Sequence, residues 1–423
     1  MSSSFGKPVA AIALLGIVAA ATVAASRLGW LGGPSQDRTR CLNTEQRFTP
    51  DETIEACTAA IEAADTSSAR SVVLQGRGIA YHAKGEQDLA LADYDEAIRI
   101  APKSATAFTN RGNAYFAKGD LQRALADYNE ALALNAKLTA ALLARSELYR
   151  RQGEFDRAIA DGNEAIRLDP RAPAAFNDRG LTYLENGAVN LAVADFDEAI
   201  RLNPDRADSF YDRGYAYLQK GDNNQAIADF NETIRLAPAF AFAFIYRGNA
   251  YRGLGDLAGA VADFKEAMRL DPKSPEVPWT LGRIDFNAGD YAAAASDLAR
   301  AVELKPDQAY FLIWRYLAQA RAGSADDARA ALGSDAGKLD AVKWPYPVVE
   351  LYLEQRSAES TLAAPTNADD RCEAQFYIGE WRLLQDDRDA AVEALKASAE
   401  TCPKTFIEYE GARAELKRLG KES

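Results

Sequence analysis

One pattern, repeated seven times at a spacing of 34 residues, constrains this chain more than any other feature of its sequence. Each copy places a small residue, a tyrosine, a turn glycine, an alanine, an aromatic residue and a proline in the same order, with few exceptions. Between these positions, apolar residues recur every three or four positions in two runs of about a dozen, which is the period of an amphipathic helix. A glycine separates the two runs, so each copy predicts two antiparallel helices joined by a tight turn. The small positions are Gly78, Gly112, Ser146, Gly180, Gly214, Gly248 and Gly282.

The same residue types predict how the two helices of a copy pack. A small residue on the first helix lets the second helix approach closely, and an aromatic residue of the second helix fills the space between them. One hairpin buries too little apolar surface to be stable, so neighbouring copies must stack. The pattern and its period resemble the tetratricopeptide repeat (TPR) family. The fold that this resemblance implies is all-α: a right-handed α-solenoid of helical hairpins, with degenerate capping hairpins at both ends.

The residues around the repeats predict the organisation of the chain. The third repeat is the weakest, since Ser146 replaces the small glycine and Gly162 replaces the aromatic residue. It is a candidate point for a bend, although we favour the alternative of loose packing without motion. We interpret the segments in order as a signal peptide or membrane anchor (1–26), a linker (27–36), a degenerate capping hairpin (37–70), seven repeats (71–306), a degenerate repeat with a short helix (307–356), a loop (357–370), and a terminal hairpin with a capping helix (371–423).

The amino terminus has the composition of a leader segment. Lys7 precedes eighteen uncharged residues, 8–25, that are rich in alanine, leucine, isoleucine and valine. Such a stretch is typical of an export signal. The small residues at 23–25 would suit a signal peptidase, but eighteen apolar residues also suffice for an uncleaved membrane anchor; a buried core helix is the remaining alternative. We predict a periplasmic protein, either soluble after cleavage or anchored to the inner membrane by residues 8–25.

Four cysteines support export independently. Cys41 and Cys57 lie equally far from a turn expected at residues 48–51, so antiparallel helices would bring them face to face. Cys372 and Cys402 are placed in the same way about a second expected turn. We predict two disulfides, one at each end of the solenoid, where a terminal repeat lacks a neighbour. The alternative is four free thiols inside helix cores.

Composition excludes several classes of function. The net charge of -13 argues against a nucleic-acid partner, because phosphates demand clusters of lysine and arginine. Histidine occurs once, at His82, which removes most catalytic triads and any histidine-rich metal site. The cysteines lack the close CxxC spacing of zinc or redox sites, and no phosphate-binding GxxxxGK[ST] loop occurs. The sequence therefore predicts no enzyme, no cofactor and no metal.

Arginine and aspartate recur with the repeat. An arginine precedes the small residue of six repeats, and an aspartate recurs on the second helix of all seven. We predict that they pair with each other as part of the scaffold; the alternative is a basic ladder for an acidic ligand. The arginines are Arg77, Arg111, Arg145, Arg179, Arg213 and Arg247, and the aspartates are Asp93, Asp127, Asp161, Asp195, Asp229, Asp263 and Asp297.

The family resemblance also implies where a partner binds. In TPR proteins a concave groove is lined mainly by the second, fifth, sixth, ninth, twelfth and thirteenth positions of each first helix. Aromatic rings there supply apolar contact and amides hydrogen-bond a peptide backbone, although some of these rings could instead pack between repeats. The implied partner-binding residues are Asn110, Asn113, Phe116, Arg150, Asn177, Leu181, Leu184, Tyr211, Tyr215, Leu218, Phe242, Ile245, Tyr246, Asn249 and Phe286. The same count includes Glu147, Arg151, Asp178, Asp212 and Arg252.

One use of this groove is absent from the sequence. Family members that clamp a terminal carboxylate carry lysine at the fifth position of the first helix. Here that position holds Gln75, Thr109, Leu143, Asn177, Tyr211, Ile245 and Trp279, so no carboxylate clamp is expected.

The closing segment, residues 372–381 and 406–416, is similar to the carboxy-terminal end of the bacterial NlpI-like TPR lipoproteins. That resemblance implies an envelope-facing adaptor that binds proteases and cell-wall hydrolases. This chain differs in having more repeats and no lipidation cysteine after its apolar run. We predict an exported protein-protein interaction scaffold or adaptor, with membrane contact only through the amino-terminal segment. The alternative is a cell-envelope polysaccharide or peptidoglycan-associated factor, in which the same aromatic residues stack on sugar rings.

Overall fold

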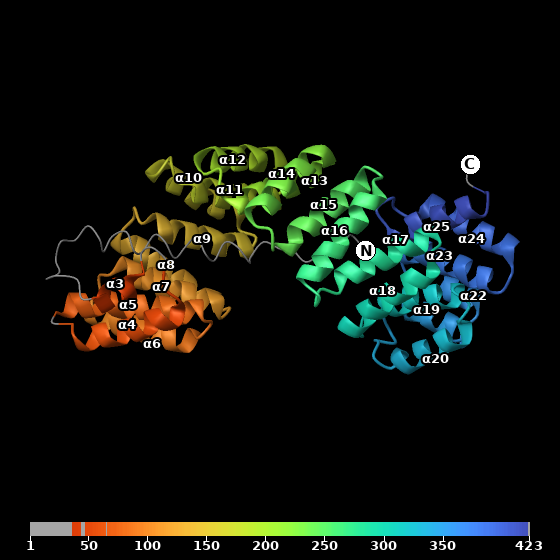
Figure 1. Cartoon of the computed structure of the whole chain (residues 1–423), viewed down its shortest axis with the longest axis horizontal. Helices are drawn as coiled ribbons and strands as arrows, with labels where there is room; N and C mark the ends of the chain where they lie inside the picture. Colours follow the sequence, from red (N-terminus) through yellow and green to blue (C-terminus); the bar gives the residue numbers. More distant parts are fainter. Residues whose placement is uncertain (1–35, 44–46, 65, 422–423) are drawn as a thin grey trace. The chain divides into compact units, whose positions relative to one another are not determined.

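The computed structural model describes residues 36–43, 47–64 and 66–421, and every regular element in those ranges is a helix (Figure 1). The chain divides after Pro238 into two compact units. Their described parts, residues 36–238 and 239–421, are called here the amino-terminal unit and the carboxy-terminal unit. The division falls between the fifth and sixth repeats, not at the third repeat, where the sequence suggested a bend.

The amino-terminal unit is a stack of helical hairpins. Each second helix packs on the first helix of the next repeat, so the hairpins follow one another in chain order. Helix α5 begins at Ser67, four residues before the predicted start of the first repeat, because Thr66 caps it by accepting a hydrogen bond from the Ala69 amide. The helices are α3 (Gln36–Leu42), α4 (Pro50–Glu62), α5 (Ser67–Ala83), α6 (Gln87–Ile100), α7 (Ala105–Ala117), α8 (Leu121–Leu134), α9 (Thr139–Arg151), α10 (Phe155–Leu168), α11 (Pro173–Glu185), α12 (Val189–Leu202), α13 (Ala207–Lys220) and α14 (Asn223–Leu236).

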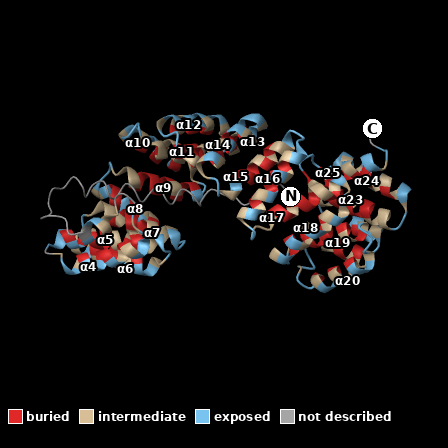
Figure 2. Ribbon diagram, viewed as in Figure 1, coloured by how far each residue is buried: buried red, intermediate tan, exposed pale blue. Residues whose placement is uncertain are grey.

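The second repeat shows how a hairpin is built. A Cβ atom on Gly112 would lie 2.6 Å from the ring of Tyr128, so only glycine lets α8 pack this closely on α7. Gly119 turns the chain with a φ of 80°, which side chains disfavour, and the Asp120 amide donates to the Tyr115 carbonyl oxygen at 2.9 Å. The predicted roles of the small residue, the turn glycine and the aromatic residue are therefore confirmed. Figure 2 shows the resulting buried positions as stripes along the helices.

The third repeat compensates for its exchanged residues. Ser146 is buried, and its hydroxyl donates to the Ala158 carbonyl oxygen at 2.9 Å. Gly162 faces the aliphatic part of Arg179, which approaches to 3.2 Å from where a Cβ would lie. Leu148 and Tyr149 fill the core of this hairpin from the first helix. The repeat is thus closely packed without the usual glycine and aromatic residue.

The repeated arginines and aspartates pair as predicted. In six repeats, the guanidinium Nε and Nη2 donate to both oxygens of the aspartate sixteen residues later, at 2.6–2.8 Å. In the amino-terminal unit, Nη1 also reaches the preceding repeat, as where Arg111 donates to Asp95 at 2.7 Å and Arg213 to Asp197 at 2.6 Å. Each such arginine therefore joins its own two helices and ties them to the previous hairpin. The alternative of a basic ladder for an acidic ligand is wrong, because these guanidinium groups are already used.

The seventh repeat shows what the arginine contributes. Leu281 stands where the other repeats have arginine, and Asp297 is left without that partner. Burial, together with the nearby Asp285, raises the pKa of Asp297 to about 6.

The carboxy-terminal unit continues the hairpins and then departs from them. Its core gathers around the buried Trp314 of α19, which packs against Phe286 of α17 and Phe376 of α23. The closing helix, α25, contacts α17, α23 and α24. The helices are α15 (Ala241–Gly253), α16 (Leu257–Leu270), α17 (Glu276–Ala288), α18 (Tyr291–Leu304), α19 (Ala309–Arg321), α20 (Ala325–Ala336), α21 (Tyr346–Tyr352), α22 (Ala358–Ala363), α23 (Ala368–Leu384), α24 (Arg388–Thr401) and α25 (Ile407–Arg418).

Two boundaries in this unit differ from the prediction. The segment 357–370, predicted as a loop, contains helix α22. Ser357 caps this helix by accepting a hydrogen bond from the Ser360 amide at 3.2 Å, and Thr361, a residue of the helix, is buried. Helix α23 begins at Ala368 instead of residue 371, capped by Asn367, whose side chain accepts from the Asp370 amide at 2.8 Å. Both starts use side-chain caps that a hydrophobic pattern does not reveal.

The structure joins the cysteines in the predicted pairs. Cys41 of α3 bonds to Cys57 of α4, and Cys372 of α23 bonds to Cys402 at the end of α24. The predicted signal or anchor, 1–26, and almost all of the linker, 27–36, lie outside the described residues. Within the described residues, no helix combines the length and apolar character that a membrane crossing requires.

We expect Arg179→Met to lower the free energy of unfolding by about 2–3 kcal/mol, because it leaves the buried Asp195 without its cation. Urea unfolding followed by circular dichroism measures this. The matched control is Arg201→Met, which breaks an exposed pair with Glu198 and should cost no more than about 0.5 kcal/mol. Equal losses for the two variants would contradict a scaffold role for the repeated arginine.

We expect the double substitution Cys41→Ala with Cys57→Ala to destabilise α3 and α4 by about 3 kcal/mol, the chain-entropy value for a loop of this length. Faster amide hydrogen exchange in α3 and α4, with α9 unchanged as the internal control, would show it. Titration of the unfolded, unreduced parent protein should find no free thiol, and four reactive thiols would contradict both disulfides.

Candidate functional site

The first helices of successive repeats form one continuous surface in the amino-terminal unit. Helix α7 contacts α9, α9 contacts α11, and α11 contacts α13. We call the side chains that these four helices carry at the predicted positions the first-helix face. It brings together the predicted residues from Asn110 to Leu218, which come from four separate parts of the sequence.

Some of the predicted residues are buried under the first-helix face instead of being exposed on it. Leu181, Leu184 and Tyr211 are buried, and the two leucines belong to the core of the fourth hairpin with Phe196. The alternative that some of these residues pack between repeats therefore holds for them. Asn113, Phe116, Tyr215 and Leu218 are half-buried and keep surface that solvent reaches.

The predicted residues of the carboxy-terminal unit differ in how far they are exposed to solvent. Phe242 of α15 is 37% exposed and Asn249 is half-buried, whereas Ile245 and Tyr246 are buried. Phe286 has 0% of its surface exposed, because it packs against Trp314 and Tyr291. Phe286 is thus a core residue, and a partner does not reach it in this structure.

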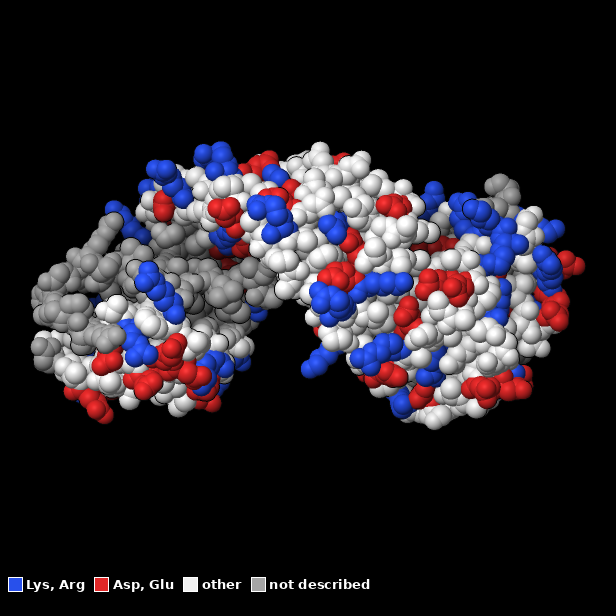
Figure 3. Space-filling view, in the orientation of Figure 1, with Lys and Arg blue, Asp and Glu red and all other residues white. Residues whose placement is uncertain are grey.

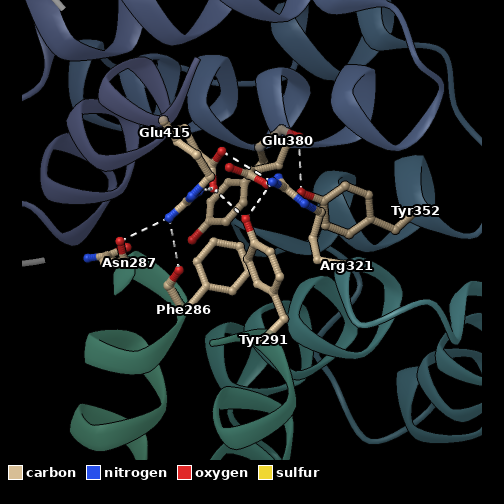
Figure 4. A network of polar contacts seen from close by, with 9 residues as sticks. Phe286, Asn287, Tyr291, Arg321, Tyr352, Glu380 and Glu415 are labelled. Carbon is tan, nitrogen blue, oxygen red and sulfur yellow. Dashed lines mark hydrogen bonds and ion pairs between the residues drawn. The ribbon is translucent and has the colours of Figure 1, made fainter. Parts of the chain in front are cut away.

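Helix α25 covers the first helices of the carboxy-terminal unit through a polar network (Figure 4). Arg418 of α25 donates to the carbonyl oxygens of Phe286 and Asn287 at 3.4 and 3.0 Å. Glu415 of α25 accepts from Tyr291 at 3.2 Å and from Arg321 at 3.3 Å. These bonds join α25 to α17, α18 and α19.

The same helix reaches α15. Glu410 of α25 pairs with Arg252 of α15 and Arg283 of α17, each at 3.3 Å. In this unit, therefore, arginines of the first helices α15, α17 and α19 form ion pairs with carboxylates of α25, a helix of the same chain.

A second carboxylate of the network, Glu380 of α23, is fully buried. Arg321 donates to its Oε2 at 2.8 Å, whereas its Oε1 has no hydrogen-bond partner among the described residues. Burial, with Glu415 close by, raises the pKa of Glu380 well above its usual range, and Arg321 only partly offsets this. Glu380 and Glu415 are closed to solvent, and the network joins α25 to the helices that it covers.

A different arrangement of charge occupies the first-helix face. Arg150 of α9 is 5% exposed and pairs with Glu147 on its own helix and with Glu185 of α11. Arg206, before α13, donates to both carboxylate oxygens of Asp208 at 2.7–2.9 Å. These arginines are therefore already paired with carboxylates.

Two further carboxylates of this face have no such cation. Asp178 of α11 has no hydrogen bond or ion pair to its carboxylate in the described part of the chain, and Asp212 of α13 accepts only from the Asn177 amide, at 2.8 Å. Both are surrounded by protein atoms yet keep some accessible surface. The pKa of each is raised to about 7, mainly by burial. Glu147 and Asp208 contribute to the rise for Asp178, and Asp208 contributes for Asp212, whereas Arg150 and Arg206 partly offset both.

Two amides of the face are buried with an unused polar atom. Asn110 of α7 is 8% exposed and its Nδ2 has no hydrogen-bond partner, and Asn177 of α11 is 3% exposed with an unpartnered Oδ1. Buried polar groups are normally satisfied, and each unmet group costs about 1–3 kcal/mol. A donor or acceptor from a bound molecule would remove that cost.

The sequence prediction missed Glu185, Arg206 and Asp208. Glu185 and Asp208 occupy the thirteenth and second positions of their first helices, so the same positional rule could have included them. Arg206 precedes α13 in the connecting turn, and no positional rule for a helix reaches it. The single histidine, His82, contacts Gln87 at 2.7 Å, and no cluster that could hold a metal ion occurs among the described residues.

We expect Glu380→Gln to flatten the pH dependence of stability. The raised pKa means that the folded chain holds a proton on Glu380 that the unfolded chain releases above about pH 4.3, so stability falls as the pH rises from there. At pH 8 the variant should be more stable by about 1 kcal/mol or more, a rise of roughly 2–4 °C in Tm, and at pH 4.5 it should match the parent.

Thermal unfolding at both pH values tests this, with Glu359→Gln, an exposed glutamate of α22, as the control. A difference between Glu380→Gln and the parent that does not change with pH would show that the buried carboxyl is not protonated in the folded chain.

Comparison with known proteins gives one consistent family. Models described as "Tetratricopeptide repeat" match residues 105–138, 146–210, 211–275, 251–313 and 373–405, and a model described as "TPR repeat" matches residues 78–119. Together these matches cover more than half of the chain, including the first-helix face.

Several solved structures are similar over part of the chain. MamA is 27% identical and covers 41% of this chain and 94% of its own, with a TM-score of 0.36. A tetratricopeptide repeat protein from Parabacteroides merdae is 23% identical and covers 60% of this chain and 100% of its own, with a TM-score of 0.46. PilF of Pseudomonas aeruginosa is 20% identical and covers 53% of this chain and 95% of its own, with a TM-score of 0.43.

Proposed function

We propose that this chain, which belongs to the tetratricopeptide repeat family, is an exported adaptor that binds an extended segment of a partner protein on its first-helix face. The observation that carries the proposal is the combination of unused polar atoms with half-exposed apolar side chains on α7 to α13. Asn110 and Asn177 offer a donor and an acceptor that nothing in the described chain satisfies. An extended peptide presents alternating N–H and C=O groups, which are the complement of such amides.

Apolar contact for that segment is available beside Asn110. Phe116 lies on the same helix and keeps part of its ring accessible, with the guanidinium of Arg151 4.5 Å from its centroid. A ring held in place in this way presents a defined surface with little entropy left to lose on binding. Amide and ring together are typical of sites that bind peptides.

Export is supported by the sequence and by the disulfides. The leader at 8–25 has the composition of a signal or anchor. Each disulfide joins two helices at one end of the described chain, and such bonds persist in oxidising compartments such as the periplasm. The resemblance of residues 372–381 and 406–416 to the NlpI-like lipoproteins, which rests on the sequence alone, would place the partner in the cell envelope, as a protease or a cell-wall hydrolase.

The polysaccharide alternative has less support. Stacking on a sugar requires an aromatic ring with one free face, and three of the predicted aromatic residues, Tyr211, Tyr246 and Phe286, are buried. We therefore favour a peptide ligand.

We expect Asn110→Ala to separate binding from stability. It removes a buried donor that has no partner in the free protein, so the free energy of unfolding should stay the same or rise. Affinity for a peptide selected against the full chain from a random twelve-residue library should fall about tenfold, since a hydrogen bond of about 1.4 kcal/mol is lost. Isothermal titration calorimetry and urea unfolding measure the two effects.

Asn190→Ala, on the exposed part of α12, is the matched control and should change neither quantity. Phe116→Ala should weaken the same peptide by up to about 2 kcal/mol. Unchanged affinity in both Asn110→Ala and Phe116→Ala would place the binding site elsewhere, and binding of purified peptidoglycan in place of any peptide would favour the polysaccharide alternative.

A further inference from the structure

The first-helix face carries more carboxylates than it has cations to pair with them. On α9, α11 and α13 with the preceding turn, Arg150, Arg151 and Arg206 are all engaged. Arg150 and Arg151 share Glu147, Arg150 also holds Glu185, and Arg206 holds Asp208. Two carboxylates, those of Asp178 and Asp212, remain without a cation.

Asp178 and Asp212 are placed to share one ligand. They occupy the same register position of α11 and α13, two helices in direct contact. Helix axes in contact lie about 8–10 Å apart, so side chains at one register position of two such helices are neighbours on the surface. Both carboxylates have Arg150, Arg206 and Asp208 among their charged neighbours, which places them in one electrostatic environment.

An independent observation indicates a missing hydrogen-bond donor at this point. Asn177 precedes Asp178 in the chain and donates through Nδ2 to Asp212 at 2.8 Å, so it links α11 to the second carboxylate. It is 3% exposed, and its Oδ1 has no partner. Because the Nδ2 of Asn177 is already used by Asp212, the groups left at this point, when both carboxylates are ionised, are acceptors. A primary ammonium has three donors and no acceptor.

We propose that Asp178, Asp212 and the Oδ1 of Asn177 form a binding site for the primary ammonium of a lysine side chain in the partner segment. This inference rests on the proposed function and names the chemistry of the partner. The site selects a segment with a lysine, placed where the segment crosses α11 and α13.

The carboxy-terminal unit contains the converse pairing. There the first helices α15, α17 and α19 present Arg252, Arg283 and Arg321, and the helix that covers them supplies Glu410 and Glu415. Complementary charges therefore accompany the covering of first helices in this unit. The amino-terminal unit has carboxylates in the corresponding helices, and a basic segment is their complement.

The protonation of the site agrees with a missing cation. The pKa values of Asp178 and Asp212 are raised to about 7, mainly by burial. Glu147 and Asp208 also raise the pKa of Asp178, and Asp208 also raises that of Asp212. Arg150 and Arg206 lower both pKa values, and the hydrogen bond from Asn177 lowers that of Asp212. A bound ammonium would favour the ionised carboxylates and lower both pKa values. Affinity for lysine should therefore rise with pH between about 6 and 8.

The experiment uses the full chain and peptides selected from the random twelve-residue library. We expect lysine at one fixed position of the selected peptides, and at least a tenfold loss of affinity when that lysine is replaced by norleucine or acetyl-lysine. In the double variant Asp178→Asn with Asp212→Asn, the parent peptide and its norleucine analogue should bind with similar affinity. Asp156→Asn, an exposed aspartate of α10, is the matched control and should keep the full preference.

The outcomes separate this inference from the proposed function. Peptides that bind in a way that Asn110→Ala weakens, but without any preference for lysine, would overturn the ammonium site and leave the adaptor intact. A lysine preference that survives in the double aspartate variant, checked for folding by circular dichroism, would also overturn it. Tight binding of an arginine analogue in place of lysine would contradict the choice of a primary ammonium, and the absence of any peptide binding would overturn both.

Discussion

The architecture depends on one contact that recurs in five of the seven repeats, in which an aromatic ring of the second helix lies against the backbone of a first-helix glycine. At Gly112 the approach of Tyr128 leaves no room for a Cβ atom, and Gly180 and Gly214 have the same relation to Phe196 and Phe230. This contact fixes the crossing of the two helices within a repeat. Because the hairpins stack in chain order, the first helices of neighbouring repeats in the amino-terminal unit lie side by side and carry equivalent positions on one surface.

Charge is distributed differently over the two helices of a repeat. On the second helices, each aspartate from Asp93 to Asp263 is matched by an arginine with bidentate geometry, and these pairs hold the scaffold together. On the first-helix face, Asp178 and Asp212 have no such match. Because Asp178 and Asp212 lie on a surface that solvent reaches, a cation from a ligand can supply the match that the scaffold aspartates obtain from arginine.

Much of the fold follows from the sequence because its period is local. The hairpins, the arginine–aspartate pairs and the two disulfides all depend on spacings within one or two repeats, and spacing is what a sequence displays. The division after Pro238 does not follow, since the period continues across it without a change. Helix α22 was missed because its start depends on the Ser357 cap, and a six-residue helix has too few apolar positions to show a period.

The candidate site was predictable only in part. The positional rule found Asn110, Asn177, Asp178 and Asp212, because equivalent positions of stacked helices share a surface. It could not tell that Phe286 would be covered, since α25 is distant in sequence and returns to pack near it. Nor could it tell which carboxylates would lack a cation, because Arg150 pairs with Glu185 from the next repeat and Arg206 acts from a turn.

The most direct measurement is a structure of the full chain with a selected lysine-containing peptide. The account predicts an extended peptide along α7 to α13, with backbone hydrogen bonds to Asn110 and the lysine ammonium between Asp178 and Asp212. A peptide seated on the second helices, or on the carboxy-terminal unit, would contradict the assignment of the first-helix face as the binding surface.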